Sequence, residues 1–218
     1  MKVSIEWLYK VPKSNSLMLR SDELDVHEAI KAAKDIERTG RVKWLKLIDE
    51  HNDEWSVKKL ERYIMELDKE PHDLEVYFDG SYDLTTSQAG GGVVIYYTQG
   101  SIRRRIRKNG ILEQITSNNE AEYAALHLAL TELELMGVHH LPVIIRGDSQ
   151  VVIQQLQGEW AVFDKEHNRW IDRIEEKLQA MKLKPTYELV ERKLNDEADQ
   201  LAHQSLKGIE IESEMTII

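Results

Sequence analysis

The stretch LEVYFDGS at residues 74–81 runs from apolar residues into an Asp-Gly pair, and LPVIIRGDSQ at residues 141–150 repeats this arrangement. Apolar runs of this length that end at turn residues are typical of buried β-strands. Each stretch therefore predicts a strand with an aspartate, Asp79 or Asp148, at its carboxyl end. Ligands of open α/β sheets bind beyond the carboxyl ends of the strands, so the two aspartates mark a candidate site.

The residues around these two stretches predict one α/β unit over residues 74–206. Further strands are expected at 89–97, 101–108 and 186–190, and helices at about 118–136, 149–157, 165–182 and 196–206. Three strands in sequence followed by helix–strand crossovers favour a five-stranded mixed sheet flanked by helices. We expect residues 207–218 to form a loosely held C-terminal tail.

Residues 1–70 predict a small separate α+β domain with the order β-β-α-β-α. Asp25 and Glu28 form an N-terminal capping pattern for its first helix, which Gly40 ends. We expect Trp7, Trp44 and Trp55 to lie in its core rather than to act as base-stacking surfaces. The charged segment at 67–73 predicts a linker. The domain could position a substrate, hold a partner or mediate self-association, and the sequence leaves these roles open.

The composition fits a soluble globular protein. The chain has 218 residues, of which 41% are hydrophobic and 31% charged, and it has no apolar run long enough to span a membrane. The absence of cysteine and of a signal-peptide pattern favours a cytoplasmic location. The net charge of −10 argues against a generally basic nucleic-acid binder. It leaves room for an enzyme that meets phosphates through metal ions.

The predicted helix at 118–136 carries two candidate carboxylates near its start. Ser117 and Glu120 match a capping box, and Glu120 lies on a mostly polar face that we expect to be solvated. Glu122 instead lies on the face that continues through Leu126 and Ala129. A carboxylate at the head of an apolar face needs a charged partner. The alternative is that Glu122 only complements the helix dipole.

The closing helix repeats this pattern. Asn195 is a suitable N-cap, and Asp199 lies on the apolar face of the helix. Ordinary structural roles exist for each acid by itself, since Asp79 suits a turn, Asp148 suits a helix cap and Asp199 suits a buried ion pair. Four carboxylates gathered at one sheet edge would repel each other, which divalent cations would relieve. Oxygen ligands favour Mg²⁺ or Mn²⁺.

Residues 74–206 resemble the type 1 ribonuclease H family. The resemblance rests on Asp79-Gly80-Ser81, on Ser117-Asn118-Asn119 with Glu122, on Asp148-Ser149-Gln150, and on Asn195 with Asp199-Gln200-Leu201-Ala202. It implies a ribonuclease H-like fold and a site in which Asp79, Glu122, Asp148 and Asp199 hold two Mg²⁺ or Mn²⁺ ions. The implied reaction is endonucleolytic hydrolysis of the RNA strand of an RNA–DNA hybrid, which leaves 5′-phosphate and 3′-hydroxyl ends.

The resemblance also implies a set of residues that bind the substrate. These are Gly80, Ser81, Ser117, Asn118, Asn119, Ser149, Gln150 and Arg192. Asn118, Asn119 and Gln150 would contact the minor groove, where 2′-hydroxyls distinguish RNA from DNA. Their alternative roles are helix caps and a surface side chain.

The chain departs from the family pattern in two places. The segment before the last motif has Arg192 and Lys193 but no histidine, and the stretch after Asp148 lacks a basic protrusion. His203 could support the site or be a partly exposed helix residue. The basic run at 103–108 could attract phosphates, although a charged edge strand explains it better. The alternative function is therefore a catalytically weak or silent nucleic-acid-binding accessory protein on the same scaffold, and a nuclease for another nucleic acid is a third possibility.

Overall fold

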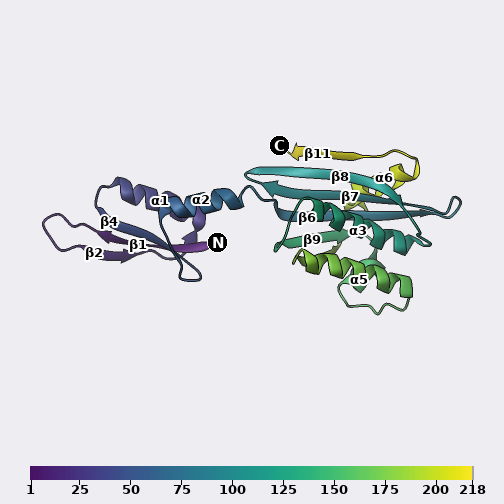
Figure 1. The fold of residues 1–218 in the computed structure, drawn as a ribbon, viewed down its shortest axis with the longest axis horizontal. Coiled ribbons are helices and arrows are strands. Elements are labelled where there is room, and N and C mark those ends of the chain that lie inside the picture. The colour runs from purple at the N-terminus through teal and green to yellow at the C-terminus, as the bar shows by residue number, and fades with distance from the viewer. Residues whose placement is uncertain (218) are drawn as a thin grey trace. The chain divides into compact units, whose positions relative to one another are not determined.

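The computed structural model describes residues 1–217 and divides the chain into two compact units, Met1–Lys69 and Glu70–Ile218. The boundary lies within the predicted linker. None of the described helices is long and apolar enough to cross a lipid bilayer. The order of the elements is visible in Figure 1, where the first unit is purple to blue and the second runs from blue to yellow.

The first unit is a small sheet with two helices packed on one face. Its elements are β1 (Lys2–Tyr9), β2 (Leu17–Arg20), β3 (Leu24–Asp25), α1 (Val26–Arg38), β4 (Val42–Asp49), β5 (Glu54–Trp55) and α2 (Val57–Leu67). The sheet order is β2-β1-β4-β5, with β3 paired to β1. The Asp25 side chain caps α1 by accepting from the N–H of His27 at 2.9 Å, as the sequence predicted.

The core of the first unit lies between this sheet and its helices. Ile5, Leu47, Ala29 and Leu60 are buried in it, and Trp7 and Trp55 pack against it. Trp44 does not belong to this core and is 38% exposed, so the prediction that it is a core residue is wrong. The reason is that Trp44 lies on the face of the sheet opposite the core strand residues Leu45 and Leu47.

The second unit contains a mixed sheet with helices on both faces. Its elements are β6 (His72–Asp83), β7 (Gln88–Gln99), β8 (Ile102–Leu112), α3 (Asn118–Leu135), β9 (Pro142–Gly147), α4 (Gln150–Leu156), α5 (Lys165–Ala180), β10 (Lys184–Leu189), the 3₁₀ turn η1 (Arg192–Leu194), α6 (Asp196–Leu206) and β11 (Glu212–Ile217). The strand order is β10-β9-β6-β7-β8-β11. The pairs β6–β9 and β9–β10 are parallel, and the other pairs are antiparallel.

The α/β fold predicted from the sequence is confirmed, with one correction. The predicted tail at 207–218 includes β11, which pairs with β8 and makes the sheet six-stranded rather than five-stranded. Glu212 and Glu214 of β11 form ion pairs with Lys108 and Arg104 of β8. These contacts join segments about one hundred residues apart, so local sequence patterns do not reveal them.

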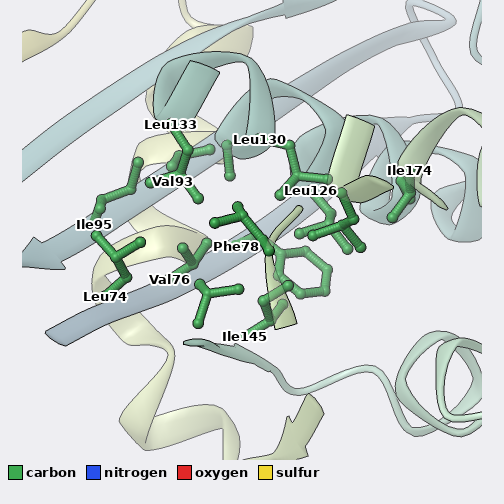
Figure 2. Packing of buried hydrophobic residues seen from close by; sticks show 14 of the residues in the cluster. Leu74, Val76, Phe78, Val93, Ile95, Leu126, Leu130, Leu133, Ile145 and Ile174 are labelled. Atoms are coloured by element: carbon green, nitrogen blue, oxygen red, sulfur yellow. The ribbon is translucent and has the colours of Figure 1, made fainter. Parts of the chain in front are cut away.

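The main core of the second unit lies on the face of the sheet that α3 and α5 cover. Figure 2 shows Phe78 of β6 among Leu126 and Leu130 of α3 and Ile145 of β9. On the opposite face, α6 packs against Val94 of β7 through residues that include Ala198 and Leu201. This arrangement places the N-terminal parts of α3 and α6 on opposite sides of β6 near Asp79, and the candidate site lies there.

Candidate metal centre

Two adjacent parallel strands bring Asp79 and Asp148 to the same edge of the sheet. Asp79 lies in β6, and Asp148 directly follows the last residue of β9. The pairing of Val76 with Ile145 and of Tyr77 with Arg146 fixes the register, so the two strands reach their aspartates at nearly the same level. Asp148 follows the end of β9, as predicted. The prediction that Asp79 ends its strand is wrong, because β6 stays paired with β7 as far as Asp83; only the parallel pairing of β6 with β9 ends just before Asp79, at Tyr77.

The N-terminal part of α3 supplies Glu122, its fifth residue, which lies directly over the backbone of β6. The Gly80 N–H donates to Oε2 of Glu122 at 3.2 Å. A Cβ at position 80 would be 2.1 Å from the carbonyl carbon of Ala121, so only glycine allows the helix to approach the strand this closely. The Asp-Gly pair in the sequence therefore has a packing role as well as a chemical one.

Glu120, the other candidate on α3, has a structural role. It is buried and accepts hydrogen bonds from the Thr116 N–H at 2.7 Å and from the Thr116 hydroxyl at 2.5 Å. Ser117 caps the helix by accepting from the Glu120 N–H at 3.2 Å. The prediction of a capping arrangement is confirmed, whereas the prediction that Glu120 is solvated is wrong because the preceding loop covers it.

Asp79, Glu122 and Asp148 form a compact carboxylate cluster. One oxygen of each lies within 4.8 Å of the others, and Asp79 and Glu122 are only 6% and 5% exposed. Burial, followed by the charges of Asp148 and Asp199, raises the pKa of Asp79 to about 7. Burial, followed by the charges of Asp79 and Asp148, raises the pKa of Glu122 well above its usual value. Hard divalent cations suit such a set of crowded oxygen donors.

Asp199 lies at the same cleft but outside this cluster. Its Oδ1 accepts from Arg192 at 2.9 Å, and its Oδ2 is 3.5 Å from Nδ1 of His203. Arg192 is 77% exposed, so its ion pair with Asp199 is easily exchanged with solvent or with another ligand. The four predicted carboxylates thus share one cleft of about 440 Å³, which Arg192 and His203 also line.

Comparisons with known proteins agree with this geometry. A family model described as reverse transcriptase-like matches residues 77–205, a range that includes all four carboxylates. This chain belongs to the reverse transcriptase-like family. The uncharacterized protein YpeP of Bacillus subtilis (strain 168) is 44% identical over 192 residues, which cover 88% of this chain and 84% of that protein.

Two further relatives connect this reverse transcriptase-like chain with ribonucleases H. Ribonuclease HI of Halobacterium salinarum is 32% identical over 133 residues, which cover 61% of this chain and 64% of that protein. The crystal structure of LC11-RNase H1 in complex with an RNA/DNA hybrid has a TM-score of 0.54 and 26% identity, and the match covers 62% of this chain and 98% of that one. The predicted ribonuclease H-like fold is therefore confirmed.

Asn195 has a role in this reverse transcriptase-like chain that the sequence did not reveal. The sequence predicted that its side chain caps α6, but it makes no capping hydrogen bond. Its Nδ2 instead donates to the Phe78 carbonyl oxygen at 2.9 Å and to Oδ1 of Asp148 at 3.2 Å. Because Asn195 is 1% exposed, it fixes β6, β9 and the start of α6 relative to one another around the carboxylates.

The predicted substrate-binding residues divide into two groups. Gly80, Ser81, Asn118, Ser149 and Arg192 line the carboxylate cleft. Among the described residues that line it, we do not find the other three, Ser117, Asn119 and Gln150. Ser149 and Ser117 both cap helices, and Asn118 Oδ1 accepts from the Tyr82 N–H at 3.2 Å. The roles of both groups in substrate binding remain predictions.

The basic run on β8 is not an exposed edge strand, because β11 covers it. Its cations also have carboxylate partners. Arg103 pairs with Glu75, Arg104 with Glu214, Arg105 and Arg107 with Glu197, and Lys108 with Glu132 and Glu212. The run is therefore neutralised within the second unit, and this favours neither of the two roles that the sequence suggested for it.

Proposed function

We propose that this chain is a metal-dependent endoribonuclease that hydrolyses the RNA strand of RNA–DNA hybrids. The observation that carries the proposal is the cluster of Asp79, Glu122 and Asp148, whose oxygens converge within 4.8 Å at the edge of the sheet. The hybrid bound by LC11-RNase H1, whose fold this unit shares, supports the choice of substrate. The expected products carry 5′-phosphate and 3′-hydroxyl ends.

The residues present fit two divalent cations. Asp79, Glu122 and Asp148 offer carboxylate oxygens in the cluster, and Asp199 offers a further pair once Arg192 releases it. Two Mg²⁺ or Mn²⁺ ions held there would supply an activated water and stabilise the departing oxygen in an in-line displacement. The protein's own part is to hold the carboxylates in place through Gly80 and Asn195 and to keep them partly dehydrated.

The cleft also offers groups that fit a ribose–phosphate backbone. Asn118 and the hydroxyls of Ser81 and Ser149 lie beside the carboxylates, and they donate and accept hydrogen bonds as a 2′-hydroxyl requires. Arg192 is exposed at the mouth of the cleft and provides a positive charge for a phosphate. We therefore propose that these side chains bind the hybrid, and we keep Ser117, Asn119 and Gln150 as further candidate contacts.

The experiment is a cleavage assay with purified protein and its Asp148→Asn variant. Labelled RNA–DNA hybrid, double-stranded RNA and double-stranded DNA would each be incubated with Mg²⁺ or Mn²⁺. We expect cleavage only of the RNA in the hybrid, and we expect the variant to lose it. Circular dichroism would verify that the variant is folded. A folded wild-type protein that cleaves no substrate with either metal would overturn the proposal.

One observation favours a second candidate, a catalytically weak or silent nucleic-acid-binding protein. Arg192 occupies Oδ1 of Asp199, and it carries a fixed positive charge that competes with a cation. The Arg192→Ala variant separates the two functions. If Arg192 holds the site inactive, the variant gains cleavage. If Arg192 binds substrate for an active enzyme, the variant loses hybrid affinity and retains its metal affinity.

A further inference from the structure

The charges of the first unit are strongly segregated, although the unit as a whole is nearly neutral. Residues 7–20 and 38–48 contain no acidic residue, and together they contain the seven basic residues Lys10, Lys13, Arg20, Arg38, Arg41, Lys43 and Lys46. The two segments meet at one end of the sheet, where the Lys10 N–H donates to the Arg41 carbonyl oxygen at 2.7 Å. We call this region the basic end.

The opposite end of the same sheet is rich in acidic residues. There β1 begins beside β3 and the end of β4, with Lys2 opposite Asp25 and Val3 opposite Asp49. The adjoining loops carry Asp22, Glu23, Glu50 and Asp53, and β5 begins with Glu54. This unit therefore has a positive end and a negative end although its net charge is near zero, and an anion would be attracted only to the positive end.

An exposed apolar row that includes one tryptophan lies beside the basic end. Leu8 of β1 pairs with Met18 on one side and with Trp44 on the other, so the three side chains form a row across β2, β1 and β4. They lie on the sheet face that α1 and α2 leave open, and Met18 and Trp44 are 60% and 38% exposed. The pairing of β1 with β4 shifts between Leu8 and Tyr9, so that Lys43, which precedes Trp44 in β4, has no partner in β1.

Most cations of the basic end lack an internal partner. Across residues 1–217, no ion pair involves Lys10, Lys13, Arg38 or Lys43, and all four are exposed. Arg20 and Lys46, one residue row further along the open face, are paired with Glu6 at 3.5 and 3.3 Å. The basic end that adjoins this row thus carries four cations without an ion pair, and Lys46, although paired, also lies over the Trp44 ring, 5.8 Å from its centroid.

We propose that the first unit binds an unpaired nucleic-acid strand at the basic end, with a base stacked on Trp44 and phosphates on Lys10, Lys13, Arg41 and Lys43. Sheet faces bind single strands through aromatic rings that bases stack on and through cations that follow the backbone. A base within a duplex is already stacked on its neighbours, so Trp44 selects an unpaired strand. Because the phosphates of the strand are negative, the acidic end of the sheet would repel them.

This inference is independent of the catalytic proposal, because it concerns a different unit and needs neither a metal ion nor cleavage. It also gives the chain phosphate-binding cations in addition to Arg192 of the second unit. The basic residues of β8 in that unit are already paired with carboxylates. A single strand that adjoins a hybrid is the kind of nucleic acid for which both sites would be useful.

The test measures binding of the full-length chain, in the presence of a metal chelator, to fluorescein-labelled single-stranded DNA and RNA of about 12 nucleotides. We expect Trp44→Ala to raise the Kd at least about fivefold through the loss of base stacking. The Trp44→Phe variant keeps an aromatic ring and should recover most of the affinity. Met65→Ala, which removes an exposed apolar side chain from α2, is the matched control and should leave the Kd unchanged.

Salt dependence separates the phosphate contacts from the stacking. For single strands, the slope of log K against log salt changes by about 0.7 for each phosphate contact. The double variant Lys10→Ala with Lys43→Ala should therefore reduce the slope by about 1.4, while Lys58→Ala on α2 and Trp44→Ala should leave it unchanged. Far-ultraviolet circular dichroism would verify that each variant is folded.

Three outcomes would overturn the proposal. One is that the wild-type chain does not bind either single strand. Another is that it binds them with an affinity that Trp44→Ala and the lysine variants do not change, which would place the binding elsewhere in the chain. The third is self-association that Trp44→Ala abolishes in sedimentation experiments without any strand binding, because the open face would then bind a second copy. None of these outcomes bears on hybrid cleavage by the second unit.

Discussion

Replacing Asp79 by asparagine should stabilise the metal-free protein at neutral and alkaline pH. The pKa of Asp79 is raised from 3.8 to about 7, chiefly by burial and then by the charges of Asp148 and Asp199. A carboxyl whose pKa is raised by folding stabilises the folded protein fully only when the pH is below the pKa of that carboxyl in the unfolded chain. That stabilisation falls as the pH rises from about 4 to 7, because the unfolded chain releases the proton more readily.

The size of the effect follows from the shift in pKa. Each pKa unit corresponds to about 1.4 kcal/mol, so a shift of roughly three units makes the second unit about 4 kcal/mol less stable above pH 7 than below pH 4. Asp79 is 6% exposed, so solvent screens little of this difference. The Asp79→Asn variant stays neutral and should keep a nearly constant contribution across this range. The pKa of Glu122 is shifted in the same direction, so the stability of both proteins still falls to some extent as the pH rises.

Hydrogen exchange of the β6 amides at pH 5 and pH 8, with chelator present, measures the stability of this unit separately from the first. After correction for the intrinsic exchange rates, wild-type protein should lose protection between the two pH values, and Asp79→Asn should lose about 2.7 kcal/mol less, because about two of the three pKa units fall between pH 5 and pH 7. Asp172→Asn removes one exposed charge from α5 and serves as the control. Equal losses of stability in wild type and Asp79→Asn would refute the assignment of a buried, proton-binding carboxyl to Asp79.

Three further predictions test the site. Mg²⁺ affinity, measured by calorimetry, should rise between pH 6 and 8, because the cation must displace protons from carboxyls of raised pKa. Gly80→Ala should destabilise the unit by at least ~1–3 kcal/mol in urea unfolding, whereas Gly110→Ala, whose Cβ meets no atom within 4 Å, should not. Asn195→Ala should cost about 1–3 kcal/mol and weaken metal binding, because it removes donors to Phe78 and Asp148.

The sequence predicted the parts of the fold and of the site that depend on local patterns. Alternating and helical periodicities predicted the strands and helices, because one face of each buries apolar residues. Comparing the faces of one helix selected Glu122 over Glu120, and Glu122 lies in the cluster. Apolar runs that end in aspartate placed Asp79 and Asp148 at one edge, since both strands are parallel neighbours in the sheet.

The predictions that failed depend on contacts between distant segments. The capping role expected of Asn195 was replaced by hydrogen bonds to Phe78 and Asp148, which lie 117 and 47 residues away. Strand β11 is held by pairing with β8 and by its own glutamates, and no periodicity within 207–218 reveals that partner. Trp44 was predicted to be buried because tryptophan usually is, but one face of its sheet has no helix packed on it.

The hydrogen bonds of the carboxylate cluster distinguish it from a group of acids that serves only the fold. Buried carboxylates with a structural role are usually hydrogen-bonded, and Glu120 here accepts two hydrogen bonds from Thr116. Glu122 accepts one hydrogen bond, Asp148 accepts one, and no described residue donates to Asp79. Folding brings these three charges together while leaving most of their acceptor capacity unused. Cations bound to the remaining oxygens would recover the free-energy cost of that arrangement.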